Sequence, residues 1–116
     1  MDYQHIEEKY SFNGEIFYCP LALAMEVIGG KWKAMLIFNL QYGALRSSEL
    51  QRRIQGVSNK MFTQIVRDLE KSGLIERTVY PVVPPKVEYK LTELGLSVLP
   101  MIRELSQWGR SIGKKL

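Results

Sequence analysis

The feature that most constrains the fold is a gap of three residues, 55–57, between two helical segments. The first segment, RSSELQRRI, has Ser48 and Gln51 at the spacing of a capping box, which predicts a short helix of about two turns. The second segment, residues 58–72, begins with a serine suited to an N-cap and stops before Gly73. Two helices across so short a glycine-containing turn are typical of a helix-turn-helix unit.

A strand, a proline-rich loop and a second strand follow this unit. We expect the strands at residues 74–80 and 86–91, and the second alternates apolar with charged residues, which predicts one buried face. The prolines between them cannot donate to a strand ladder and fix their own φ, so the loop should be stiff and projecting. A hairpin that follows a helix-turn-helix is the wing of a winged helix.

Three more helices complete the predicted fold. The segment LALAMEVI follows a proline and ends before two glycines, as helices commonly do. Residues 31–43 are apolar around most of the helix circumference, which predicts a central, covered helix. Thr92 should cap a last helix that runs towards Ile112, and Pro100 should interrupt and kink it.

The predicted fold class is therefore mainly α with a small β-hairpin, an α+β winged helix-turn-helix. Residues 1–18 should form an N-terminal arm, polar over 1–15, and residues 19–116 one domain. The last helix either caps its own domain or, since it offers more apolar surface than the other elements can readily cover, binds a second subunit. Its apolar residues are Leu94, Val98, Ile102, Leu105, Trp108 and Ile112.

The helix at 58–72 has two opposite faces when its residues are placed about 100° apart. One face is apolar and should pack on the core: Met61, Phe62, Ile65, Val66 and Leu69. The other is basic and rich in amides: Asn59, Lys60, Thr63, Gln64, Arg67 and Lys71. Such side chains can donate to guanine, pair with adenine or touch the thymine methyl, so the face suits the major groove of DNA. The alternative is a helix face that is only solvated.

The hairpin carries basic residues that could reach the neighbouring DNA backbone. Lys86 leaves the proline-rich loop, and Arg77 and Lys90 lie behind it on the strands. A stiff loop would lose little conformational entropy on binding. The alternative is that the prolines only protect a sheet edge from mispairing.

Length, charge and cysteine content narrow the classes of function. With 116 residues the chain should form one small domain, and its net charge of +4 is a mild basic bias. One cysteine and one histidine allow neither an intrachain disulfide nor a Cys/His zinc site, and no catalytic or phosphate-loop spacing occurs. We therefore expect no enzyme, cofactor or metal. No apolar run approaches the roughly 20 residues that cross a bilayer, which predicts a cytoplasmic protein without a membrane partner.

Over about residues 19–110 the sequence resembles the HxlR-type branch of winged helix-turn-helix bacterial transcription regulators, relatives of the MarR-like proteins. The motifs that carry the resemblance are CP at 19–20, IGGKWK at 28–33, LR..EL at 45–50, S.K..TQ..R.LE..GLIER at 58–77 and YP.VPPKVEYKLTELG at 80–95. Together they are specific, although each alone is weak. One departure is Ser47, where the family usually has a bulky apolar residue, and it leaves the packing of the short helix open.

The resemblance implies a homodimer on a near-palindromic operator in double-stranded DNA. It places Ser58, Lys60, Thr63, Gln64 and Arg67 on the recognition helix, and Pro84, Pro85 and Lys86 on the wing. Dimerisation would use the last helix and parts of LALAMEVI, with the two recognition helices about 34 Å apart. The alternative function is a winged-helix module for protein contacts without specific DNA binding.

Cys19 is the residue with the most reactive chemistry. Pro20 indicates a position at a helix N-terminus, where backbone N–H groups favour a thiolate, whereas Phe17 and Tyr18 favour burial, which disfavours charge. Two interpretations stay open, an inert core residue and a redox sensor. Some family members resemble sensors that use the cysteine of this CP pair, which makes an oxidant or electrophile the candidate effector.

Overall fold

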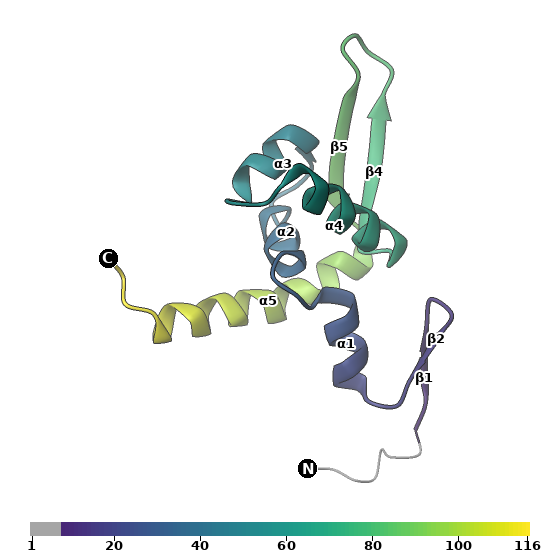
Figure 1. Cartoon of the computed structure of the whole chain (residues 1–116), viewed down its shortest axis with the longest axis vertical. Helices are drawn as coiled ribbons and strands as arrows, with labels where there is room; N and C mark the ends of the chain where they lie inside the picture. The colour runs from purple at the N-terminus through teal and green to yellow at the C-terminus, as the bar shows by residue number, and fades with distance from the viewer. Residues whose placement is uncertain (1–7) are drawn as a thin grey trace.

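The computed structural model describes residues 8–116, and the elements fall in the order that a winged helix-turn-helix requires. Helices α3 and α4 are the helix-turn-helix, and strands β4 and β5 are the wing (Figure 1). In chain order the elements are β1 (Tyr10–Phe12), β2 (Glu15–Phe17), α1 (Pro20–Ile28), α2 (Lys33–Asn39), β3 (Leu45–Arg46), α3 (Ser47–Arg53), α4 (Asn59–Lys71), β4 (Ile75–Tyr80), β5 (Lys86–Leu91) and α5 (Glu93–Ile112).

Helix α4 begins and ends where its sequence predicts. The Ser58 hydroxyl accepts a hydrogen bond from the backbone N–H of Met61 at 3.0 Å, which satisfies one of the free donors of the first turn. After the last turn Gly73 adopts φ +81°, a left-handed conformation that glycine enters without strain. The chain then turns directly into β4.

The capping box predicted for α3 is wrong. Helix α3 starts at Ser47, so its N-cap is Arg46, two residues before the Ser48 cap that was expected, and Arg46 makes no side-chain cap hydrogen bond. Arg46 is held in extended conformation by pairing with Glu88, so the helix starts immediately after the strand. The Gln51 side chain does not close a box and instead donates to Asn59 Oδ1 on α4, linking the two helices.

The wing belongs to a three-stranded antiparallel sheet rather than to an isolated hairpin. The strand order is β3-β5-β4, with Leu45 opposite Tyr89 and Ile75 opposite Leu91. Tyr89 and Leu91 are buried and Val87 is half-buried, so the predicted alternation does produce one inward face on β5. The extra strand β3 has only two residues and was not predicted.

The core lies where α2, α3, α4, the sheet and the start of α5 meet. The central position predicted for α2 is confirmed, because Leu36 and Ile37 are fully buried. On α4 the expected apolar face is buried except for Met61, which is 41% exposed and was wrongly placed in the core. The buried apolar residues are Ile28, Leu36, Ile37, Leu40, Leu50, Ile54, Phe62, Ile65, Val66, Leu69, Leu74, Ile75, Tyr89, Leu91, Leu99 and Ile102.

The expected polar arm contains an unpredicted hairpin. Strands β1 and β2 pair antiparallel around a turn in which Asn13 has φ +49°, and the Asn13 amide donates to the Lys71 carbonyl at the end of α4 at 3.1 Å. The N-terminal hairpin is therefore attached to the end of α4. Residues 1–7 of the expected arm lie outside the described residues.

Helix α5 begins at the base of the wing and extends past the other helices (Figure 1). The Thr92 hydroxyl accepts from the Gly95 N–H at 3.1 Å, as predicted for its cap. The predicted interruption at Pro100 is wrong, since the helix continues through this residue to Ile112. Within residues 8–116, no helix has both the length and the apolar composition of a membrane span.

Candidate nucleic-acid interface

The polar face of α4 is exposed along its whole length. Phe62 fixes the opposite face, because its ring meets the Tyr89 ring of β5 edge to face, with centroids 6.5 Å apart and planes at 84°. This contact orients the helix against the wing and adds to the apolar packing. The exposed predicted residues are Ser58, Asn59, Lys60, Thr63, Gln64, Arg67 and Lys71.

The cations on this face are free to bind another molecule. Among the described residues, no ion pair or side-chain hydrogen bond engages Lys60, Arg67 or the amine of Lys71. Their charges are available to phosphates and to the acceptor atoms of guanine.

The uncharged residues of this face are partly engaged within the chain. The Thr63 hydroxyl donates to the Asn59 carbonyl at 2.9 Å, so its oxygen can still act as an acceptor. The Asn59 side-chain oxygen accepts from Gln51, so its amide hydrogens remain for other acceptors. Gln64 Nε2 donates to Asp68 Oδ1 at 2.8 Å.

The wing presents fewer free charges than its sequence suggests. Lys86 Nζ lies 3.1 Å from a Glu88 carboxylate oxygen and 4.7 Å from the centre of the Tyr80 ring. Lys90 Nζ lies 3.0 Å from a Glu76 carboxylate oxygen. Arg77 has no ion pair among residues 8–116 and is the available cation of the three.

These ion pairs shift the pKa values of Glu88 and Lys90. The hydrogen bond from Lys86 is the largest cause that lowers the pKa of Glu88, and the Tyr80 hydroxyl, which lies 3.1 Å from the carboxylate, lowers it further. The hydrogen bond to Glu76 raises the pKa of Lys90. The predicted tip residues Pro84 and Pro85 are exposed, and the peptide before Pro84 is cis.

A hollow of about 550 Å³ is lined by residues of α3, α4 and the wing, beside the contact of Phe62 with Tyr89. Arg67 and Arg77 line it, from α4 and from β4. Ser47 also lines it, next to Phe62 and Tyr89. The small side chain at this departure from the family pattern therefore faces the hollow rather than the centre of the core.

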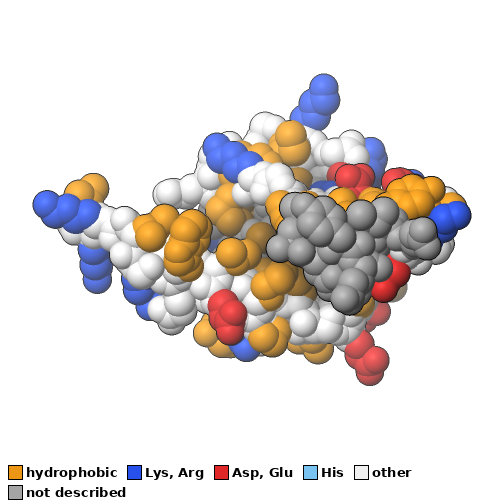
Figure 2. All heavy atoms as spheres, turned by 90° about the horizontal axis from the view of Figure 1, so that it is seen from below, with side chains coloured by type: hydrophobic (Ala, Val, Ile, Leu, Met, Phe, Trp, Pro, Cys, Tyr) orange, Lys and Arg blue, Asp and Glu red, His pale blue; other side chains and the backbone are white. Residues whose placement is uncertain are grey.

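Helix α5 carries more exposed large apolar side chains than any other element of the described chain. Leu94, Leu105, Trp108 and Ile112 are 45–66% exposed and Val98 is half-buried. Ile102 is only 4% exposed and packs in the core of its own chain. Its predicted place in the dimer interface is therefore wrong. Seen from below, apolar side chains gather along the projecting helix and on the adjoining body (Figure 2). On α1, Leu21 and Met25 are exposed as well.

Cys19 is exposed and precedes the first residue of α1 as its N-cap residue. Its backbone is extended, and Pro20 occupies the first turn, as the sequence indicates. In a single subunit Cys19 is therefore not a core residue, and the interpretation as an inert core residue does not hold there.

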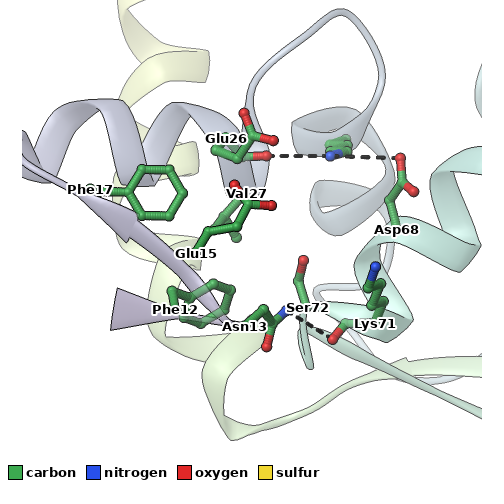
Figure 3. Close-up of a pocket in the computed structure, with 10 residues that line it drawn as sticks. Phe12, Asn13, Glu15, Phe17, Glu26, Val27, Asp68, Lys71 and Ser72 are labelled. Atoms are coloured by element: carbon green, nitrogen blue, oxygen red, sulfur yellow. Dashed lines mark hydrogen bonds and ion pairs between the residues drawn. The ribbon is translucent and has the colours of Figure 1, made fainter. Parts of the chain in front are cut away.

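A second tie to α4, absent from the sequence expectations, comes from Lys33. Its amine lies 3.4 Å from the Glu26 carbonyl and 3.8 Å from Asp68 Oδ2, so it bridges α1 and α4 (Figure 3). The bridge borders a cavity of about 190 Å³ whose other wall includes Phe12 and Phe17 of the hairpin. The contact joins residues far apart in sequence, so no local pattern could have revealed it.

Among residues 8–116, no cluster of His, Cys, Asp or Glu could hold a metal.

An exposed basic helix, packed against a hairpin and preceded by a short helix, defines a winged helix-turn-helix DNA-binding protein. Residues 27–115 match the model of the HxlR-like helix-turn-helix family. The chain belongs to this family, as its motifs indicate, and is a transcriptional regulator.

Relatives with the same role are similar over most of their length. An HTH-type transcriptional regulator of Methanothermobacter thermautotrophicus is 48% identical over 97 residues, which are 84% of this chain and 74% of that protein. The HTH-type transcriptional regulator YkvN of Bacillus subtilis is 50% identical over 93 residues, 80% of this chain and 79% of YkvN.

Solved structures extend the similarity to the fold. The redox regulator HypR in its oxidised form has a TM-score of 0.79 and 39% identity, over 84% of this chain and 100% of that one. The reduced form of YodB from B. subtilis has a TM-score of 0.70 and 31% identity, over 83% of this chain and 95% of that one. The predicted fold class is confirmed.

Proposed function

We propose that the protein acts as a homodimer that binds a near-palindromic operator, with α4 in the major groove and the wing on the adjacent backbone. The observation that carries the proposal is the pair of unengaged cations, Lys60 and Arg67, on a helix whose other face is fixed to the core. Because the helix is held from behind, it can enter a groove without unfolding its supports. We assign no catalytic role and expect a cytoplasmic protein.

The exposed apolar surface of α5 supports the homodimer. Burying one large apolar side chain contributes about 1.5–3 kcal/mol, and six such side chains on α5 are exposed to solvent. A twofold axis near α5 and α1 would bring two copies of α4 to successive turns of one duplex face, about 34 Å apart. Residues 19–116 would then form the regulatory unit, with 1–18 as its N-terminal arm.

We further propose that thiol modification of Cys19 by an oxidant or electrophile releases the DNA. The exposed thiol lies between the N-terminal hairpin and α1, and both elements are tied to α4 through Asn13 and Lys33. A bulky or charged adduct at this junction would disturb both ties. The name of HypR, a redox regulator, is in keeping with this proposal.

The experiment is a gel shift with footprinting on DNA upstream of the protein's own gene, with and without diamide or a quinone. Wild-type protein should protect two half-sites about one helical turn apart and release them on oxidation. Cys19→Ser should bind DNA with unchanged affinity and resist release. Equal release of the Cys19→Ser variant would remove the thiol switch, while a lack of any footprint would remove the operator proposal.

A further inference from the structure

Gln64 is held in one orientation by a neighbour on its own helix. Its Nε2 donates to Asp68 Oδ1 at 2.8 Å. An ionised carboxylate only accepts hydrogen bonds, so the NH₂ end of the amide must face Asp68 and Oε1 must face away. The carboxylate thereby fixes which end of the amide a bound molecule would meet.

Asp68 is itself restrained by the rest of the fold. Its second oxygen lies 3.8 Å from Lys33 Nζ, and the same amine contacts the Glu26 carbonyl at 3.4 Å (Figure 3). The Lys33 side chain is only 20% exposed, and that of Asp68 is 40% exposed. A series of contacts therefore runs from Glu26 and Lys33, near the α1–α2 junction, through Asp68 to Gln64 on the exposed face of α4.

We propose that Asp68 is a positioning residue that sets the base preference of Gln64. This inference rests on the proposed binding of α4 in a major groove. With one amide hydrogen directed to Asp68, Gln64 presents an acceptor, Oε1, beside one remaining donor hydrogen. The matching major-groove edge is that of adenine, whose N6 donates and whose N7 accepts.

The anchor disfavours the guanine edge. An unrestrained glutamine can turn its amide over and offer both amide hydrogens, which suits the paired acceptors of guanine. Asp68 disfavours that turn because it would set Oε1 against a carboxylate. The anchor also removes side-chain freedom that would otherwise be lost on binding.

The test uses a randomised duplex pool, because it needs no known operator. Wild-type protein should select sequences with one position at which adenine is preferred on the order of tenfold, and Gln64→Ala should lose that preference. Asp68→Ala should keep DNA binding but reduce the preference at this position to less than about threefold. Asp68→Asn, which retains an acceptor at the same place, should keep more of the preference than Asp68→Ala.

Glu70→Ala is the matched control for charge. Glu70 is an exposed acid of α4 that makes no ion pair among the described residues and does not contact Gln64. Both Asp68→Ala and Glu70→Ala remove one negative charge, so both should bind all duplexes more tightly at low salt. Only Asp68→Ala should flatten the base preference, and it should have no further effect on preference in the Gln64→Ala background.

Two results separate failure of this inference from failure of the proposed function. If wild-type protein selects no sequence from the pool, operator binding itself is contradicted. If wild-type protein selects a sequence and Gln64→Ala loses one position, but Asp68→Ala keeps that preference at full strength, Asp68 does not position Gln64.

Discussion

At the scale of single residues, Gly95 shows how tightly α5 is joined to the end of α4. A Cβ on Gly95 would lie 2.1 Å from the Leu74 carbonyl oxygen, closer than atoms can approach without backbone movement. The same carbonyl accepts from the Thr92 N–H at 3.0 Å, and the Thr92 hydroxyl donates to the Gly73 carbonyl at 2.6 Å. The junction therefore leaves no room for a side chain.

We predict that Gly95→Ala destabilises the fold by about 1–3 kcal/mol, because the backbone must shift to admit the methyl group. Gly109→Ala on the same helix is the control, since a Cβ there has no neighbour within 4 Å in the described chain. It should stabilise by up to about 1 kcal/mol, as alanine favours helix more than glycine does. Urea denaturation measures both, and equal effects would contradict the close approach.

Residue roles could be predicted where one local pattern fixes them. The helical period separated the exposed and buried faces of α4, and Ser58 and Thr92 were correctly predicted as caps. Met61 was misplaced because it lies at the border of the apolar face, where neighbouring elements and not the period decide burial. The contacts of Gln51 and Lys33 could not be predicted, because each of these side chains contacts residues of a different helix from its own.

At the scale of elements, the strands of the wing carry two ion pairs, one within β5 and one between β5 and β4. Lys86 contacts Glu88, and Lys90 contacts Glu76. The contact with Lys86 favours the Glu88 carboxylate and lowers its pKa in the fold. Its contribution to stability is thus present above the unfolded pKa and is lost as the pH falls through the folded pKa.

We predict that the Glu88 carboxyl titrates below the ordinary range of a glutamate in wild-type protein, and that Lys86→Met raises this midpoint. The reason is loss of the largest favourable interaction of the carboxylate. NMR of the side-chain carboxyl over a pH series gives the midpoint directly. Lys60→Met, which removes a lysine that makes no contact with Glu88, should leave it in place. Identical midpoints in all three proteins would contradict the pairing.

The two unpredicted elements have weak sequence signals for physical reasons. Strand β3 has two residues and exists because β5 offers a free edge, so the information lies in β5 and not in Leu45 or Arg46. The N-terminal hairpin turns at Asn13-Gly14, which is a hairpin signal, but its strands have only three residues each, too few to establish an alternating pattern. By contrast, β5 has six residues with clear alternation, and its bounds were predicted correctly.

At the scale of the whole molecule, α5 extends the chain beyond its own core, and we expect a second subunit to cover it. Leu105→Glu and Trp108→Glu should each place a charge in that interface and shift the protein to monomer, because an unpaired charge there would lose its hydration. Sedimentation velocity measures the change. Val83→Glu is the control, since Val83 is 99% exposed at the wing tip. If the two α5 variants kept the wild-type mass, α5 would not form the interface.

The central claim is that the outer face of α4 binds a duplex. It is tested by the DNA affinity of wild-type protein and of the variant with Lys60, Gln64 and Arg67 all replaced by alanine, each measured over a range of salt concentration. For wild-type protein log affinity should fall against log salt with a slope of about −0.9 for each phosphate contact, and the triple variant should lose sequence preference and show a shallower slope. Unchanged affinity and slope in the triple variant would contradict the account and would favour a winged-helix module that binds protein.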